Sequence, residues 1–366
     1  MFLALREIWH AKLRFALITL VIVMVSSLVF IISGLANGLS EGNTAAIEAL
    51  PADGIVVSAG SDYQLERSTI KANDAASIAS VPGVEAAELI GISSASVKSE
   101  ASDSLIGVSL FGVDPAGMVA PSVDEGTWIG DTTNGVVIDE SLAKKGIGVG
   151  DSLTLEPEGI ELDVTGIVSG QSYRIAPVIF MPLELWQSAR AAGGGYQEST
   201  ATAVLVKGSG TALVQIPTAV PDTMVGSKKQ VSDHIPGESE QNSTLLLIQI
   251  FLVVIAAGII AAFFYIITLQ KMPELGVMKA IGTGTGYLAK ALVSQVFALA
   301  LVGVLLGISI SDTLALVIGD AVPYSVSMDR MALFGSLLLL VALASTLLSL
   351  LRIARIDPLD AINRTA

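Results

Sequence analysis

Four long stretches of this 366-residue chain contain no charged side chain. They cover residues 15–40, 241–270, 291–311 and 331–351, with lengths of 26, 30, 21 and 21 residues. An α-helix needs about 20 mostly apolar residues to cross the hydrocarbon core of a bilayer. Each stretch is therefore predicted to be one transmembrane helix. The first is too long for the apolar region of a signal peptide, so we expect it to remain uncleaved.

The charges beside these stretches predict their orientation. The segments before the first stretch, between the second and third, and after the fourth together carry nine basic and four acidic residues. The connection at 312–330 is net negative. Because basic residues concentrate in cytoplasmic segments, both termini are expected in the cytoplasm and the chain in the cell membrane. The expected order is an interfacial helix (1–14), a membrane helix (15–40), an outer domain (41–240), a second helix (241–270), a cytoplasmic loop (271–290), a third helix (291–311), an outer loop (312–330), a fourth helix (331–351) and a cytoplasmic tail (352–366).

The segment from 41 to 240 is long enough to form a domain of its own. It carries 27 acidic and 10 basic residues, which argues against nucleic acid as a partner because phosphate binding requires a basic surface. Short apolar runs between turn residues predict a mixed α+β fold. The expected strands are 54–58, 105–113, 135–138, 152–155, 162–168, 177–181 and 203–207, the expected helices are 74–80 and 140–145, and the expected surface loops are 191–199 and 208–211.

Few residue types suited to catalysis are present. The chain has no cysteine, which excludes disulfides, thiolate metal sites and cysteine nucleophiles. His10 and His234 are expected on opposite sides of the membrane, so they form neither a zinc site nor part of a catalytic triad. A phosphate-binding loop with its lysine is absent, and the glycine-rich segment 282–286 is predicted to be a turn. We therefore expect no catalysis, no resident metal and no intrinsic cofactor.

The cytoplasmic loop is predicted to contain a short amphipathic helix. Pro273 suits a first helical turn, and Glu274 favours the positive end of the helix dipole. Gly282 suits the end of the helix. An apolar stripe at helical spacing consists of Leu275, Met278 and Ile281. Such a helix packs either on its own membrane helices and lipid or on a partner beneath the membrane.

Two cytoplasmic stretches resemble one known family. Residues 271–282 read KMPELGVMKAIG, and residues 355–362 read RIDPLDAI. Both resemble the FtsX/MacB-type (type VII) permeases of ABC transporters, whose loop carries E-x-G-x-x-[KR]-A-[IL]-G and whose tail carries D-P-x-x-A-[IL]. Residues 136–155 and 162–181 resemble the core of that family's extracytoplasmic domain. The order of one helix, a large outer domain and three helices is also similar.

The resemblance implies a half-size permease without an ATPase domain of its own. It implies a homodimer that pairs with two copies of a cytoplasmic ATPase, which would bind ATP-Mg and drive efflux by motion carried through the first two helices. The absence of charges deep in the spans argues against an ion-coupled carrier. The coupling helix would comprise Pro273, Glu274, Leu275, Gly276, Met278, Lys279, Ile281 and Gly282. Small residues would let copies of the first two helices meet: Gly34, Gly38, Ala257, Gly258, Ala261 and Ala262.

The proportions of the chain resemble the haem-exporting permeases of Gram-positive bacteria, the Hrt type. This implies a hydrophobic or amphiphilic substrate, with haem as the leading candidate, taken from the outer leaflet. An iron ligand is then expected where the first two helices leave the lipid, and the candidates are Glu41, Glu48, His234, Glu238, Glu240 and nearby methionine or tyrosine. We favour Glu41 because it is the first charge after the 26-residue stretch. Alternatively, Glu41 only marks the water interface.

Other functions also fit the family. The chain could be an FtsX-like regulator that switches a cell-wall hydrolase and transports nothing. It could export an antimicrobial peptide or a macrolide, or release lipoproteins to an acceptor at a second membrane. The sequence does not distinguish among these functions.

Overall fold

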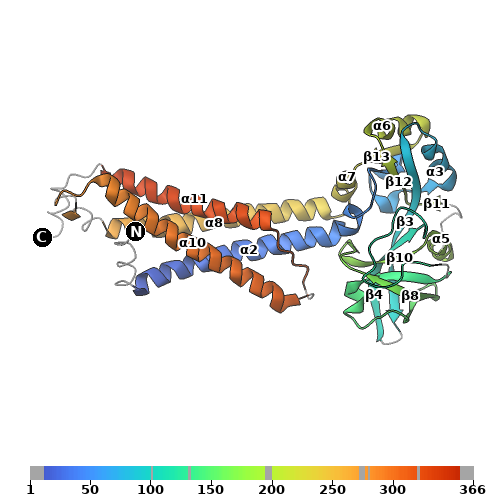
Figure 1. Cartoon of the computed structure of the whole chain (residues 1–366), viewed down its shortest axis with the longest axis horizontal. Coiled ribbons are helices and arrows are strands. Elements are labelled where there is room, and N and C mark those ends of the chain that lie inside the picture. Colours follow the sequence, from blue (N-terminus) through green and yellow to red (C-terminus); the bar gives the residue numbers. More distant parts are fainter. Residues whose placement is uncertain are drawn as a thin grey trace. The chain divides into compact units, whose positions relative to one another are not determined.

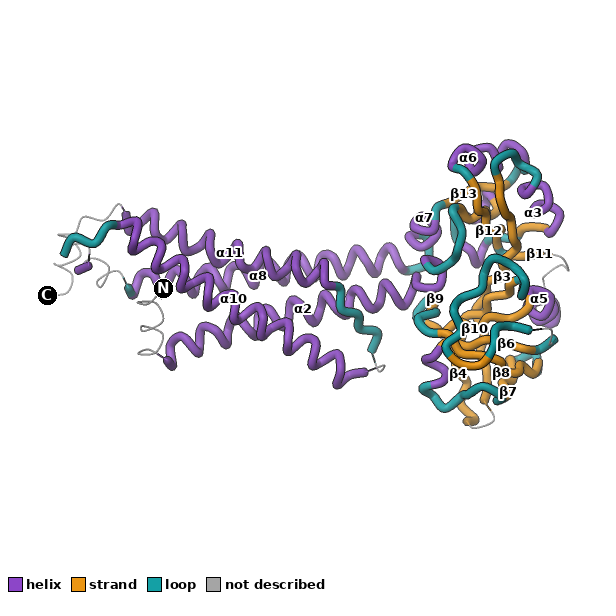
Figure 2. Tube along the Cα trace, viewed as in Figure 1, coloured by secondary structure: helices purple, strands orange, loops and turns teal. Residues whose placement is uncertain are grey.

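The computed structural model describes residues 12–99, 102–130, 133–193, 200–271, 277–278, 281–319 and 322–354. The chain divides into two compact units (Figure 1). The membrane unit comprises residues 1–38 and 243–366, and the outer unit comprises residues 39–242. Figure 2 shows that long helices make up the first unit, while the strands gather in the second.

Four helices are long and apolar enough to cross a membrane. They are α2 (Lys12–Glu48), α8 (Glu238–Gln270), α10 (Thr285–Ile318) and α11 (Met328–Ala354). Each is longer than the uncharged stretch that predicted it. Residues 285–290 were expected in the cytoplasmic loop and 312–318 in the outer loop, but both belong to α10. Charge marks where the apolar region ends, whereas the helical hydrogen bonds continue past that point.

The membrane unit has an apolar core to which all four helices contribute, including Phe30, Phe264, Val304 and Leu338. Helices α2 and α10 approach closely at small residues. The hydroxyl of Ser26 donates to the carbonyl of Gly303 at 3.2 Å. A Cβ added at Gly303 would overlap Ile22, and one added at Gly307 would overlap Ser26. Small side chains thus allow this pair of helices to pack within one chain.

The outer unit is a mixed sheet with helices around it. Its strands follow the order β13-β1-β12-β3-β4-β10-β6-β8-β5, with β7 paired to β3 and β8, and β9 paired to β10. The pairs β4–β10 and β6–β8 are parallel, while the other pairs in the main sheet are antiparallel. The strands are β1 (Gly54–Ser58), β2 (Ile70–Lys71), β3 (Val84–Ser99), β4 (Ser102–Val113), β5 (Glu125–Gly126), β6 (Gly135–Asp139), β7 (Ser152–Glu156), β8 (Ile160–Val168), β9 (Ser172–Tyr173), β10 (Ala176–Pro182), β11 (Thr200–Ala201), β12 (Ala203–Gly208) and β13 (Thr223–Gly226). The helices are α3 (Ala72–Ala79), α4 (Glu140–Ala143), α5 (Leu183–Ala192), α6 (Gly210–Ala219) and α7 (Lys228–Asp233).

The expected α+β fold is confirmed, and each of the seven expected strands lies within an observed one. Strand β3 was not predicted. Its residues read VEAAELIGISSASVKS. Ala, Glu and Ser are weak strand formers. This strand pairs with β12, β4 and β7. The hydrogen bonds to these neighbours hold it extended although its strand propensity is low.

The expected loop at 208–211 is wrong in part. Gly208 ends β12, and α6 begins at Gly210. The Ser209 hydroxyl accepts a hydrogen bond from the Ala212 N–H and so caps this helix. Serine favours turns, but it is equally favoured at the N-cap of a helix. The other expected loop, 191–199, begins too early, because Ala191 and Ala192 belong to α5, and its residues 194–199 lie outside the described residues.

The end of α2 is anchored in the main apolar core of the outer unit. Ala46, Ile47 and Leu50 are buried there together with Val231 and Ile235, which flank the end of α7. The segment between α7 and α8 is only four residues long. The end of α2 and the segment that leads into α8 are therefore held by the same cluster.

Candidate functional site

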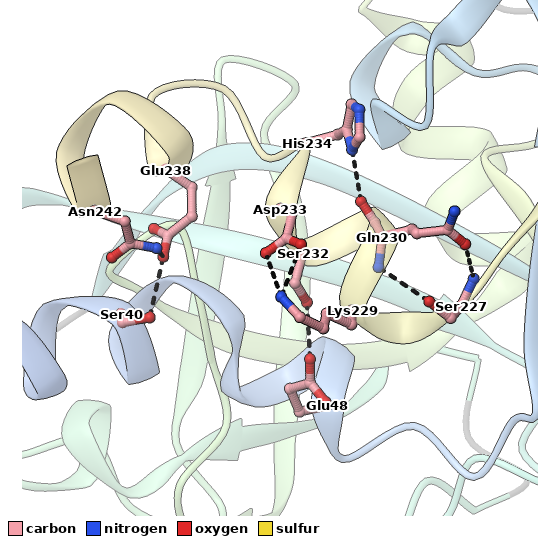
Figure 3. Close-up of polar contacts among 10 residues, drawn as sticks. All are labelled: Ser40, Glu48, Ser227, Lys229, Gln230, Ser232, Asp233, His234, Glu238 and Asn242. Carbon is pink, nitrogen blue, oxygen red and sulfur yellow. Dashed lines mark hydrogen bonds and ion pairs between the residues drawn. The ribbon is translucent and has the colours of Figure 1, made fainter. Parts of the chain in front are cut away.

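The five expected ligand residues lie where α2 ends and α8 begins, within the outer unit. Helix α7 leads into this region and is fixed by a capping box. The Ser227 hydroxyl accepts from the Gln230 N–H at 3.2 Å, and the Gln230 side chain accepts from the Ser227 N–H at 2.9 Å (Figure 3). Two backbone donors of the first turn are satisfied in this way.

Glu238 is buried and bridges the two helices. Its side chain is 2% exposed. One carboxylate oxygen accepts from the Ser40 hydroxyl at 3.1 Å and from the Asn242 amide at 2.7 Å (Figure 3). The other accepts from the Asn43 amide. A buried carboxylate requires such donors, because its desolvation is otherwise costly. Both oxygens are therefore already engaged, so Glu238 acts as a link between α2 and α8 in this arrangement and not as an open ligand.

Glu48 ties the end of α2 to α7. Its carboxylate accepts a hydrogen bond from the Ser232 hydroxyl at 3.1 Å (Figure 3). The Lys228 ammonium donates to the carbonyls of Glu48 and Leu50, at 2.7 and 3.0 Å. A cation there satisfies backbone acceptors that the helix leaves open at its C-terminus.

His234 caps α7 and turns one ring nitrogen to the backbone. Its Nδ1 lies 2.7 Å from the Gln230 carbonyl oxygen (Figure 3). A carbonyl only accepts, so Nδ1 carries the proton, and in the neutral ring Nε2 holds the lone pair. The ring packs on Tyr63 with centroids 5.3 Å apart. This tautomer is the one in which Nε2 is able to coordinate a metal.

Glu41 and Glu240 are exposed, on neighbouring ends of α2 and α8. The bond between Ser40 and Glu238 brings these two helix ends together. Next to Glu41, a hairpin formed by β9 and β10 docks on the backbone of α2. The N–H groups of Arg174 and Ile175 donate to the carbonyls of Asn43 and Gly42, at 3.2 and 2.9 Å.

Sequence reasoning missed the neutral partners in this region. Ser40, Asn43 and Asn242 provide the donors to Glu238, whereas the expected ligands were carboxylates, histidine, methionine and tyrosine, and included no serine or asparagine. The spacing of Ser40 and Asn43, three residues apart at the end of an apolar helix, places both on one helix face and is a usable signal. In the part of the chain that the structure describes, no group of three or more His, Asp or Glu side chains is suited to a metal ion.

Gly34 and Gly38 were expected to face a second copy of the chain, and the structure instead covers them with the chain itself. A Cβ at Gly34 would overlap Tyr324, and one at Gly38 would overlap Pro323. The Ser325 N–H donates to the Gly34 carbonyl at 3.1 Å, so this contact is also hydrogen-bonded. These small residues make room for the segment between α10 and α11. The pattern of charges did not predict that this segment packs on α2.

Asp312 was expected to begin the outer loop, and the structure places it within a continuous helix. It lies on α10 beside Ser311, whose hydroxyl bonds to that of Tyr324. The Asp312 Oδ1 atom is buried and has no hydrogen-bond partner among the described residues. A buried acceptor of this kind needs an explanation, and water or a ligand is the usual one.

The small residues of α8 face outward from the membrane unit. Gly258 and Ala262 are exposed, while Ala257 and Ala261 are half-buried, and a Cβ at Gly258 would meet nothing within 4 Å. Only 22% of the apolar window of α8 is buried, against 44% for α2 and α10. Among the four helices, α8 thus leaves the largest share of its apolar surface to lipid or to another protein.

The expected coupling residues are described only in part. Pro273, Glu274, Leu275, Gly276 and Lys279 lie outside the described residues, as do residues 1–11 and the tail 355–366. At the end of the loop, Ile281 is exposed and Gly282 has a φ of +99°. The Thr283 N–H donates to the Met278 carbonyl at 3.0 Å. These are the features of a helix that ends at glycine, as expected for Gly282.

Comparison with known proteins agrees with this architecture. Residues 15–218 match the family model of the MacB-like periplasmic core domain, and residues 246–358 match that of the FtsX-like permease C-terminal region. The chain belongs to the MacB/FtsX-like permeases of ABC transporters. It is a membrane protein with a large extracytoplasmic domain between its first and second helices, and membership of this family implies a partner ATPase.

Two relatives of this permease match over nearly their whole length. A protein of Staphylococcus haemolyticus named "Putative hemin transport system permease protein HrtB" is 28% identical over 363 residues, which cover 99% of each chain. A protein of the same name from Staphylococcus epidermidis is 24% identical over 362 residues, again 99% of each chain. Among solved structures, the periplasmic region of MacB from Actinobacillus actinomycetemcomitans covers 51% of this permease and 94% of its own chain, at 16% identity and a TM-score of 0.37.

Proposed function

We propose that this permease is the membrane subunit of an ABC exporter that removes haem, or a similar planar amphiphile, from the outer leaflet of the cell membrane. The observation that carries the proposal is the full-length match to the two staphylococcal proteins named for hemin transport. The functional assembly would contain two permeases and two copies of a separate ATPase that binds ATP-Mg. Both termini would lie in the cytoplasm.

Two long continuous helices support the proposal that ATP hydrolysis moves the outer unit mechanically. Helix α2 has 37 residues and α8 has 33, so they are about 55 and 50 Å long at about 1.5 Å per residue. Phe15 near the start of α2 contacts Lys271 at the end of α8, and both helices include residues of the outer unit. The segment 271–282 would seat the ATPase, and its displacement would move the outer ends of these helices.

The outer ends of α2 and α8 are where we place the substrate. Glu41 and Glu240 are exposed there, and the geometry of His234 leaves Nε2 as the lone-pair nitrogen. Glu41 remains our favoured iron ligand. A carboxylate is a weaker haem ligand than histidine or thiolate, and weak ligation suits a pump that must release its cargo. The exposed apolar face of α8 would meet the second permease copy or the porphyrin ring.

Haem titration tests this proposal. The wild-type permease and its Glu41→Ala variant are purified with the ATPase and titrated with haemin while the Soret band is recorded. We expect Glu41→Ala to weaken binding at least fivefold and to shift the band, with basal ATP hydrolysis unchanged. Glu184→Ala removes an exposed carboxylate elsewhere on the outer unit and is the matched control.

The same titration separates the alternatives. An unchanged spectrum and affinity for Glu41→Ala would remove Glu41 from the site. A wild-type complex that binds no haemin, in a strain whose haem tolerance does not depend on the permease, would contradict haem export and would favour a regulatory role or another amphiphile.

A further inference from the structure

Lys271 is a buried cation at the end of α8. Its side chain is 6% exposed, whereas lysine is almost never buried without a partner. Its N–H donates to the Ile267 carbonyl at 3.1 Å, so the residue continues the last helical turn. A cation there lies at the negative end of the helix dipole.

Two other helices meet the Lys271 ammonium. The Gln295 side-chain oxygen on α10 accepts its hydrogen bond at 2.8 Å. The Phe15 ring on α2 lies below it, with the Nζ atom 5.5 Å from the ring centroid, which is within the range of a cation–π contact. Gln295 and Phe15 are themselves 4% and 3% exposed. One ammonium therefore joins α2, α8 and α10.

The contact leaves one polar group of Gln295 without a partner in the described part of the chain. The Gln295 amide nitrogen is buried and has no hydrogen-bond partner among the described residues. Turning the amide over would place its NH₂ group against the ammonium and remove this hydrogen bond, so the contact with Lys271 fixes the orientation of the amide. A buried donor left unpaired costs free energy, and this cost accompanies the contact between Lys271 and Gln295.

We propose that Lys271 is the positioning residue through which motion of the cytoplasmic loop enters the helix bundle. It stands at the first position of the segment 271–282, so a displacement of that segment acts on it directly. Its contacts then carry the displacement to α2 and α10, while α8 follows through the chain. A lysine ammonium buried where three helices meet is well placed to respond to their displacement. This inference rests on the proposed function, because it requires a partner ATPase that moves the loop.

A nucleotide-driven signal in the outer unit tests the proposal without using haem. The chain has no cysteine, so Ser239→Cys, at an exposed position near the start of α8, takes a single environment-sensitive fluorophore. The permease–ATPase complex in nanodiscs is trapped with ADP and vanadate, and the change in fluorescence is recorded. Lys271→Met, which keeps the length but removes the charge, is expected to reduce this change at least fivefold while vanadate-trapped nucleotide stays at the wild-type amount.

Three further variants separate transmission from structure. Lys271→Arg keeps a cation and is expected to retain at least half of the signal. Lys290→Met removes an exposed lysine near the same end of α10 and should behave as wild type. Gln295→Leu removes the acceptor together with its unpaired amide, and we expect a folded complex with a reduced signal.

Wild-type signals in both Lys271→Met and Gln295→Leu would overturn the proposal. So would a signal that falls only in proportion to the amount of assembled complex, or to a lowered melting temperature, because that result describes a purely structural residue. A wild-type complex without any vanadate-dependent change would contradict the proposed function, and the role of Lys271 with it. A failure of haem binding alone would leave the transmission signal intact.

Discussion

The Ser40 hydroxyl donates a hydrogen bond of 3.1 Å to the buried carboxylate of Glu238. The two residues are 198 positions apart in the chain, and their bond joins α2 to α8. Asn43 and Asn242 complete the cluster from the same two helices. If α2 and α8 carry motion outward, this polar cluster is where their ends are held together.

Removing this carboxylate should destabilise the outer unit. Glu238→Ala leaves the amides of Asn43 and Asn242 without their acceptor, and an unsatisfied buried group costs about 1–3 kcal/mol. We expect a lower melting temperature of the purified permease. The control is Glu240→Ala, which removes an exposed carboxylate two residues away. Equal melting temperatures for the two variants would show that the cluster contributes nothing to stability.

The contact between Gly34 and Tyr324 should be revealed by a paired substitution. Gly34→Leu introduces a side chain where the Tyr324 ring already lies, and overpacking of this kind typically costs about 1–3 kcal/mol. We expect Tyr324→Ala to restore part of the lost thermal stability in the double variant. Additive losses would argue that the two residues do not meet.

A single cysteine on α8 should cross-link two permeases. Ala262 is exposed on the face that carries Gly258, so Ala262→Cys is expected to form a disulfide-linked dimer in oxidised membranes. Ala342→Cys, at a fully buried position of α11, is the control and should stay monomeric on a non-reducing gel. A dimer of equal yield from both variants would reflect non-specific oxidation, and no dimer from either would contradict an α8 interface.

The proposed topology predicts which cysteines an impermeant maleimide reaches. Val214 is 78% exposed in the outer unit, and Tyr287 is 58% exposed near the start of α10. In intact cells we expect labelling of Val214→Cys but not of Tyr287→Cys, and labelling of both after lysis. The reverse pattern would invert the membrane orientation.

Glu88 should make the outer unit less stable as the pH rises. Burial raises the pKa of this carboxyl above its ordinary value, with a further contribution from Asp114, although the hydrogen bond from the Met118 N–H opposes the shift. The folded state then holds the proton more tightly than the unfolded state, so stability falls as the pH rises from the ordinary carboxyl pKa through the raised one. We expect Glu88→Gln to raise the melting temperature at pH 7 and to leave it nearly unchanged at pH 4. A gain of equal size at both pH values would assign the effect to packing.

The membrane helices and the class of the outer domain could be predicted because each depends on patterns that are local in sequence. Uncharged stretches of 21 to 30 residues have few folded alternatives outside a bilayer. Strands such as 54–58 and 203–207 are apolar runs bounded by turn residues, and they appear at those places. The strand at 84–99 escaped prediction because its partners, and not its composition, make it extended.

The sequence predicted where the candidate ligands stand along the chain, but not how their side chains are arranged. The sequence alone determined that Glu41 and Glu238 flank the two apolar stretches, since charge cannot enter the hydrocarbon cheaply. Only the tertiary structure decided that Glu238 is buried and used by Ser40, while Glu41 stays exposed. The same holds for Lys271, whose partners lie 24 and more residues away on other helices. A hydrogen bond between distant segments depends on how helices pack, and packing is a property of the folded chain that no local pattern encodes.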